Sequence, residues 1–292
     1  MSKFMNKIDF VVIITAKNAN PNGDPLNGNR PRENYEGYGE ISDVCIKRKI
    51  RNRLQDMGEQ IFVQSDDRYT DGYRSLSERA NGCEALRIAA KDKNKEEYAK
   101  IACEKWIDVR SFGQVFAFKD SGGKGNNEGG VSIGVRGPVS IHPAISISPV
   151  DITSIQITKS VNSEPKEGVK SSDTMGMKYR VDFGMYIIKG NINYQLTSKT
   201  GFSEEDAEKI KEALRSLFEN DSSSARPDGS MEVCKLYWWK HNCPSGQYSS
   251  AKVHNTLEIK LKNENEIPRC FIDYEIALSN LDGLIPEVYE GV

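Results

Sequence analysis

Residues 41–54 read ISDVCIKRKIRNRL, a pattern that predicts one helix with an apolar stripe and a strongly basic remainder. Ser42 or Asp43 can cap its first turn, because a short oxygen-bearing side chain accepts a hydrogen bond from a free backbone N–H there. Five of the seven residues from Lys47 to Arg53 are basic, although the whole chain has a net charge of −2. A helix that packs by a narrow stripe and offers cations to one side suits a polyanion. The stripe has a four-residue spacing: Ile46, Ile50 and Leu54.

Length and composition indicate a protein with a real core and much charged surface. The 292 residues suffice for one large domain or two small ones, and 28% of them are charged. The longest apolar run, Phe10 to Ile14, has the size of a strand and is too short to cross a membrane. The N-terminal MSKF has no apolar signal core. We therefore predict a cytoplasmic protein with no membrane partner.

The six cysteines are scattered and form no CxxC pair. In a chain without a secretion signal, the expected state is a reduced and buried thiol. One zinc set is conceivable, but its spacing fits no common finger pattern, so we predict no metal and no cofactor. That set is Cys234, His241, Cys243 and His254.

One buried strand and two polar insertions organise the first two thirds of the chain. Residues 8–16 are β-branched and apolar on both faces, as expected of a central strand. The loop 17–40 is rich in Asn, Gly and Pro and leads into the basic helix. Residues 57–107 read as a helical insertion, and residues 155–180, polar and punctuated by lysines, read as an arm between two strands. No proline-rich linker divides the chain, so a single domain spanning 1–292 is predicted.

The last third predicts a second helix among strands. Ser203 and Asp206 form a Ser-x-x-Asp capping box at its start. Residues 220–231 then read as a flexible link before further strands. Two β–α–β-like halves with intervening strands indicate an α+β fold on a ferredoxin-like sheet, of which RNA-recognition domains are one version.

No motif for nucleotide binding or hydrolysis stands out. The segment GGKG at 122–125 lacks the spacing of a phosphate-binding loop. The best candidate site is the loop 17–32 together with the basic helix. The net charge of −2 argues against a protein that is basic over its whole surface, but it allows a local basic groove at such a site. The alternative is an ordinary loop beside a solvated charged helix. Asp24 could place a metal or activate a 2′-hydroxyl, although an Asp in Asn-Gly-Asp-Pro is more often a turn residue.

Several motifs occur in an order that carries a family resemblance. The chain resembles the backbone subunit of type I CRISPR surveillance complexes, called Cascade, and most of all that of subtype I-C. The similarity runs from the N-terminus to about Tyr186, and the last third is compatible with it. The motifs are VVIITAKNANPNGDPLNGNRPR at 11–32, GEISDVCIKRKIRNRL at 39–54, DVRSFGQVFAF at 108–118, VRGPVSI at 135–141 and DTMGMKYRVDFGMY at 173–186.

The resemblance implies a modified RNA-recognition fold shaped like a right hand, with a palm, a helical finger insertion at 57–107 and a thumb hairpin at 155–180. Copies of the subunit would polymerise helically along one CRISPR guide RNA. Each thumb would displace a guide nucleotide, so that the segments between pair with target DNA. The implied partners are further copies, a 5′-handle-binding and processing subunit, a large subunit and a recruited helicase–nuclease. Because that nuclease does the cutting, no catalytic residue is implied here.

The resemblance also assigns residues to the guide. Lys47 and Arg51 match the basic residues of the first helix that grip the guide's phosphates, and their spacing places them on one helix face. Whether Arg48, Lys49 and Arg53 reach RNA or a neighbouring subunit stays open. The residues assigned to RNA binding are Asn20, Asn22, Arg30, Arg32, Ser42, Lys47, Arg48, Lys49, Arg51, Arg136, Gly137, Lys159, Met175 and Lys178.

Three alternatives remain open. Met175 or Met177 fits an apolar wedge against a displaced base, but ordinary packing within the thumb explains these residues equally well. Related type III subunits cut target RNA with a loop aspartate, and Asp24 lies in the comparable loop, so a target-RNA endoribonuclease is one rival function. The other rival is a generic RNA-binding protein that acts as a monomer.

Overall fold

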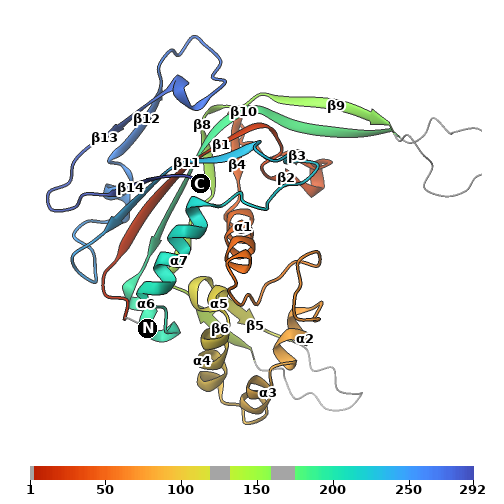
Figure 1. Cartoon of the computed structure of the whole chain (residues 1–292), viewed down its shortest axis with the longest axis vertical. Coiled ribbons are helices and arrows are strands. Elements are labelled where there is room, and N and C mark those ends of the chain that lie inside the picture. The colour runs from red at the N-terminus through yellow and green to blue at the C-terminus, as the bar shows by residue number, and fades with distance from the viewer. Residues whose placement is uncertain (1–2, 119–131, 159–174) are drawn as a thin grey trace, which may run out of the picture.

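One large antiparallel sheet forms the centre of a mixed α/β fold (Figure 1). The computed structural model describes residues 3–118, 132–158 and 175–292. β1 (Ile8–Ala19) lies in the middle of the sheet and pairs along its length with β10 (Met175–Ile192) and β11 (Met231–Lys240). The strand order is β14-β11-β1-β10-β8-β4, in which β14 is Glu287–Glu290, β8 is Ala144–Pro149 and β4 is Tyr38–Ile41. β7 (Val139–Ile141) and β9 (Ile152–Thr158) also pair with β10.

Two helices cover one face of this sheet, α1 (Asp43–Asp56) and α7 (Glu204–Arg215), and a shorter helix, α6 (Tyr194–Thr200), lies between β10 and α7 in the chain. The predicted apolar stripe of α1 is buried in the same core as alternate residues of β1. Burying each such side chain contributes about 1.5–3 kcal/mol, which fixes the helix on the sheet. The side chains of this core include Phe10, Val12, Ile14, Ile46, Ile50, Leu54, Ile210 and Leu214.

The intervening residues of β1 point to the opposite face, which is also covered. Val11 and Ile13 share a second core with Trp239, Val253 and Tyr274. The cover consists of α8 (Ser250–His254), β12 (Leu257–Leu261), η2 (Phe271–Asp273) and β13 (Tyr274–Leu278). The prediction of a central strand that is buried on both faces is therefore confirmed.

The helices begin at the side chains that the sequence offers as caps. Ser42 caps α1, because its hydroxyl accepts from the backbone N–H of Cys45 at 3.3 Å. Ser203 and Asp206 form the predicted reciprocal capping box of α7. None of the helices in the parts of the chain that the structure describes is long and apolar enough to cross a bilayer.

A smaller unit with its own core lies below α1 in Figure 1. It contains α2 (Leu76–Asn81), α3 (Glu84–Lys91), α4 (Lys95–Lys105), α5 (Ile107–Phe112), β5 (Gly113–Phe116) and β6 (Ile133–Arg136). Two glycines allow the backbones at the start of β5 and the end of β6 to approach closely. Gly113 has φ +82, and a Cβ at Gly137 would lie 2.3 Å from the Ser111 carbonyl oxygen. The motifs at 108–118 and 135–141 are thus two sides of one close backbone contact.

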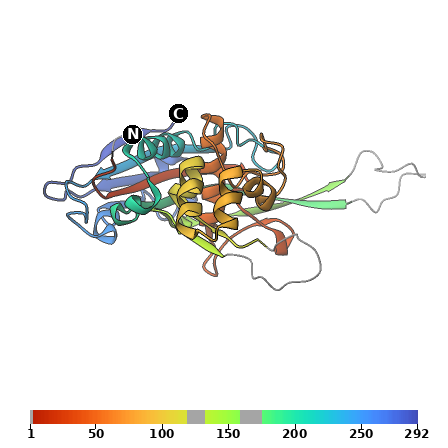
Figure 2. The same ribbon diagram turned by 90° about the horizontal axis from the view of Figure 1, so that it is seen from below.

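A two-stranded ribbon projects from the sheet on the opposite side from β12 and β13 (Figure 2). It consists of β9 and the first part of β10, whose register runs from Met175↔Thr158 to Val181↔Ile152. Ile157, Met175 and Met177 are 48–61% exposed on it. The ribbon therefore carries apolar side chains away from both sheet cores.

Candidate functional site

The connection between β1 and α1 folds back against the first turn of the helix. Asn22 Oδ1 accepts hydrogen bonds from the backbone N–H and the hydroxyl of Ser42, both at 2.9 Å. The backbone N–H of Arg32 donates to the Asn22 carbonyl at 3.0 Å. Between them lie β2 (Gly23–Asp24), η1 (Pro25–Asn27) and β3 (Arg30–Pro31). The structure thus brings three of the predicted site residues together at the N-terminus of α1.

Asn20 joins a distant segment to this connection. Its side chain is almost fully buried, and its amide nitrogen donates to the Asn29 carbonyl at 2.6 Å. Its backbone N–H donates to the Ala225 carbonyl at 2.8 Å, and that of Lys17 donates to Ser230 at 2.8 Å. Residues 220–231, predicted as a flexible link, are therefore tied to the end of β1. Among the described residues, the amide oxygen of Asn20 is buried without a partner.

The cations of this loop are paired with carboxylates that water also reaches. Arg32 lies 3.2 Å from Asp24, and Arg30 lies 3.4 Å from Glu33, with all four side chains 28–40% exposed. Asp24 Oδ1 also accepts from the Leu26 backbone N–H at 3.2 Å and caps η1. Ion pairs of this kind contribute at most about 1 kcal/mol, so an arriving phosphate can replace the carboxylate.

Two α1 cations lie on the half-exposed side of the helix. Lys47 pairs with Asp43 one turn earlier, at 2.9 Å, and the two side chains are 25% and 35% exposed. Arg48 donates to the Val63 carbonyl at 3.3 Å. Lys47 therefore resembles Arg30 and Arg32 in pairing with a carboxylate that is partly exposed.

Lys49 is placed differently from the sequence prediction. Its side chain is 4% exposed and forms an ion pair with Asp221, which is itself only 10% exposed. Burial lowers the pKa of Lys49, against the opposing effect of the Asp221 carboxylate. Asp221 also pairs with Arg226 at 3.0 Å. Lys49 thus holds the segment after α7 against α1 and does not present its charge to solvent.

Arg51, like Lys49, forms an ion pair with a buried carboxylate. Its Nε donates to Asp108 Oδ2 at 3.0 Å, with the two side chains 12% and 1% exposed. Its guanidinium also lies 5.2 Å from the ring centre of Phe112. The helix face on which sequence spacing places Lys47 and Arg51 therefore offers one half-exposed cation and one that is engaged inside the protein.

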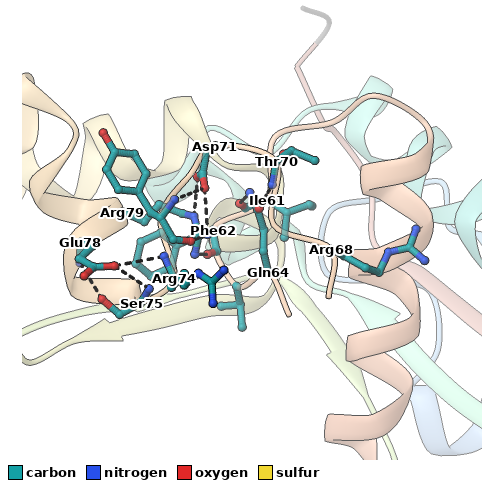
Figure 3. Close-up of polar contacts among 12 residues, drawn as sticks. Ile61, Phe62, Gln64, Arg68, Thr70, Asp71, Arg74, Ser75, Glu78 and Arg79 are labelled. Atoms are coloured by element: carbon teal, nitrogen blue, oxygen red, sulfur yellow. Dashed lines mark hydrogen bonds and ion pairs between the residues drawn. The ribbon is translucent and has the colours of Figure 1, made fainter. Parts of the chain in front are cut away.

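The segment that leaves α1 is held by Arg79 of α2, as Figure 3 shows. Arg79 is 3% exposed and donates to the Phe62 carbonyl at 2.9 Å. It also donates to Asp71 at 2.6 Å and to the Tyr73 carbonyl at 2.7 Å. This arginine therefore anchors residues 62–73 and leaves none of its three nitrogens unbonded.

The remaining predicted residues lie apart from the loop. Arg136 is exposed at the end of β6, and Gly137 packs against the end of α5. Met175 and Lys178 are exposed on the ribbon, which meets the loop where the Arg30 guanidinium lies 5.8 Å from the Tyr179 ring centre. Lys159 lies outside the described residues.

The conceivable zinc set has other contacts in the structure. His241 Nε2 lies 2.8 Å from the buried Asp9, and its Nδ1 accepts from the Gln247 backbone N–H at 2.9 Å. His254 bonds the Gly190 carbonyl at 3.2 Å. Among the described residues, no three His, Cys, Asp or Glu side chains are arranged to hold a metal ion.

Asp108 and Asp221 are the site residues that sequence reasoning missed. Asp108 opens a motif that the sequence presents only as local structure, and it pairs with an arginine 57 positions upstream. Asp221 lies in a segment that reads as a linker. Such long-range partners leave no periodic signal, although an acidic residue beside an apolar motif is the hint available at Asp108.

The fold and this loop define the chain as a mixed α/β protein with a set of partly exposed ion pairs where β1 meets α1. A family model for CRISPR-associated protein Cas7 matches residues 6–279, so the chain belongs to that family. A CRISPR-associated protein Cas7 from Haloferax volcanii is 25% identical over 270 residues, which cover 87% of this chain and 76% of the relative.

Two solved structures match this chain at low sequence identity. One, described as a CRISPR RNA-guided surveillance complex in a pre-nicking state, is 16% identical with a TM-score of 0.47 and covers 80% of this chain and 78% of its own. The other, a CRISPR RNA-guided surveillance complex, is 17% identical with a TM-score of 0.41 and covers 80% of this chain and 68% of its own. The family assignment rests on the match to the family model.

Proposed function

We propose that this chain is a backbone subunit of a CRISPR RNA-guided surveillance complex, most like those of subtype I-C. It binds the sugar–phosphate backbone of the guide RNA at the loop 20–32 and the first turns of α1. The observation that carries this proposal is that three cations of this region pair with carboxylates that are 28–35% exposed: Arg30, Arg32 and Lys47. Phosphates can displace such partners at small cost, because exposed ion pairs are weak.

The fold also supports RNA binding at the loop 20–32 and α1. When the intervening elements are left out, β1, α1, β8, β10, α7 and β11 occur in the order β-α-β-β-α-β, which is the order of an RNA-recognition core. RNA-recognition domains stack bases on their open sheet face, but here that face is covered by β12, β13 and α8. RNA therefore binds at the loop and helix rather than across the sheet. In this proposal the sheet is the palm, the unit around α2–α5 is the fingers, and β9–β10 is the thumb.

Contacts of this type hold RNA without reading its sequence, because phosphates carry no base identity. Recognition of target DNA is then left to pairing with the guide. We propose a helical assembly of copies along one guide, together with a handle-binding subunit and a large subunit. The subunit itself is not an enzyme, and cutting falls to a recruited helicase–nuclease. The assembly works in the cytoplasm.

The exposed apolar side chains of the ribbon fit the displacement of a base. Met175 and Met177 stand on one face, since they are two residues apart in the strand. A thumb with such a face can support a nucleotide that leaves the stack. The alternative, packing within the thumb, predicts that replacing both by serine lowers stability without altering guide spacing.

Binding of single-stranded RNA at increasing salt tests the proposal. Lys47→Gln removes one phosphate contact, so the slope of log affinity against log salt should become shallower by about 0.7. Fluorescence anisotropy with an unstructured RNA measures this slope. The matched control is Lys240→Gln, an exposed and acid-paired lysine that pairs with Ile8 at the opposite end of β1.

Equal slopes for Lys47→Gln and Lys240→Gln would remove α1 from the interface. Size-exclusion chromatography with absorbance at two wavelengths then separates the remaining functions. A backbone subunit co-purifies with RNA of defined length as a large particle. A generic RNA-binding monomer elutes at its own mass with heterogeneous RNA.

A further inference from the structure

Asp108 is a buried carboxylate on which three donors converge. Its Oδ1 accepts from the Phe62 backbone N–H at 2.7 Å, and its Oδ2 accepts from the Val63 N–H at 3.0 Å. Arg51 Nε donates to the same Oδ2 at 3.0 Å. The side chain of Asp108 is 1% exposed. One carboxylate therefore joins α1, α5 and the segment between α1 and α2.

The position of Arg51 makes this pair relevant to the charge of α1. Arg51 lies one helical turn after Lys47, so its charge would fall on the same strip of the helix. Asp108 neutralises it from inside, while Phe112 covers part of its guanidinium. Lys47 instead pairs with Asp43, whose side chain is 35% exposed. Two cations that look equivalent in the sequence thus differ in the charge they offer.

The same junction connects α1 to the helical unit. Arg48 of α1 donates to the Val63 carbonyl at 3.3 Å, and Arg79 of α2 donates to the Phe62 carbonyl at 2.9 Å. Residues 62 and 63 are therefore bonded through their N–H groups to Asp108 and through their carbonyls to arginines on both sides, one of which, Arg79, appears in Figure 3. Both oxygens of Asp108 are engaged at a fixed point of this junction.

We propose that Asp108 is a positioning residue that withholds the charge of Arg51 from RNA and so limits the number of phosphates that α1 neutralises. This inference rests on the proposed function and adds a means of limiting the affinity of the subunit for RNA. Removing the negative charge while keeping an acceptor for the backbone should therefore strengthen RNA binding.

Asp108→Asn tests this, because the asparagine oxygen can still accept from a backbone N–H while the charge is lost. We expect tighter binding of an unstructured RNA and a salt slope steeper by up to about 0.7, the value for one further phosphate. In an Arg51→Gln background, Asp108→Asn should give no gain. The matched control is Asp206→Asn. Asp206 is a second buried carboxylate, and it pairs with an arginine of α5, Arg110, at 2.8 Å.

The measured affinities show whether Asp108 withholds Arg51 from RNA or presents it to RNA. A loss of affinity in Asp108→Asn equal to that in Arg51→Gln would overturn the proposal, because Asp108 would then present Arg51 to the RNA. Circular dichroism reports whether each variant is folded. If Asp108→Asn does not fold, Arg51→Gln alone remains informative: a drop in slope as large as that of Lys47→Gln also overturns the proposal. Failure of the wild-type chain to bind RNA would instead reject the proposed function.

Discussion

The loop 20–32 and the helix α1 both contain cations, but they hold them in different ways. In the loop, Arg30 and Arg32 face carboxylates that are 28–33% exposed. On α1, Lys49 and Arg51 face Asp221 and Asp108, which are 10% and 1% exposed. The helix has more charge in its sequence, whereas the loop offers a larger share of its charge to solvent. The exposure of the partner, rather than the number of cations, sets what a ligand can use.

The physical reason is the cost of separating each kind of pair. An exposed pair contributes up to about 1 kcal/mol, because water replaces each partner. Removing one member of a buried pair costs about 3–5 kcal/mol, because the other charge stays unpaired in a poor solvent. A phosphate can therefore compete for Arg32 but not for Lys49 or Arg51.

The largest expected effect is on the stability of Asp108→Ala. This change leaves Arg51 without its carboxylate and two buried N–H groups without an acceptor. We expect a loss of about 3–5 kcal/mol in the free energy of unfolding, measured by urea denaturation. Asp43→Ala, which removes the exposed partner of Lys47, should cost less than about 1 kcal/mol. Similar losses in both variants would break the comparison.

An intermediate effect is expected for Lys49→Met. The variant keeps the length of the side chain but removes its charge, and Asp221 retains Arg226 as a partner. The loss of stability should therefore be about 1–3 kcal/mol, below that of Asp108→Ala. The salt slope of RNA binding should stay closer to wild type than in Lys47→Met, the matched variant of the lysine two positions earlier. A slope that falls as far in Lys49→Met would return Lys49 to the interface.

Local pattern was sufficient to predict much of the fold. The spacing of Ile46, Ile50 and Leu54 gave the buried face of α1, and the apolar run at 8–16 gave the central strand. Both signals are short-range, because periodicity records which side of an element meets a core. The Ser203–Asp206 capping box is equally local and was confirmed.

The sequence could not predict which cations remain available. Lys49 borders the apolar stripe like its neighbours, and only its contact with a residue 172 positions away removes it from the surface. The same holds for Arg51 and Asp108. Residues 220–231 look like a linker because their composition is that of one, yet hydrogen bonds from Lys17 and Asn20 fix them. Pairings set by tertiary packing leave no mark in local spacing.

The smallest expected effect is that of Asp24→Ala. Asp24 caps η1 and pairs with Arg32, but its side chain is 28% exposed, so stability should fall by less than about 1 kcal/mol. RNA affinity should change less than in Asp108→Asn, because Arg32 already faces solvent. We also expect no Mg²⁺-dependent cutting of complementary RNA by the assembled wild-type complex, since Asp24 serves as the cap of η1 through the Leu26 N–H. If the wild-type complex cuts RNA and Asp24→Ala does not, the loop has a catalytic role. Asp24 would then act in RNA cleavage rather than as the ion-pair partner of Arg32.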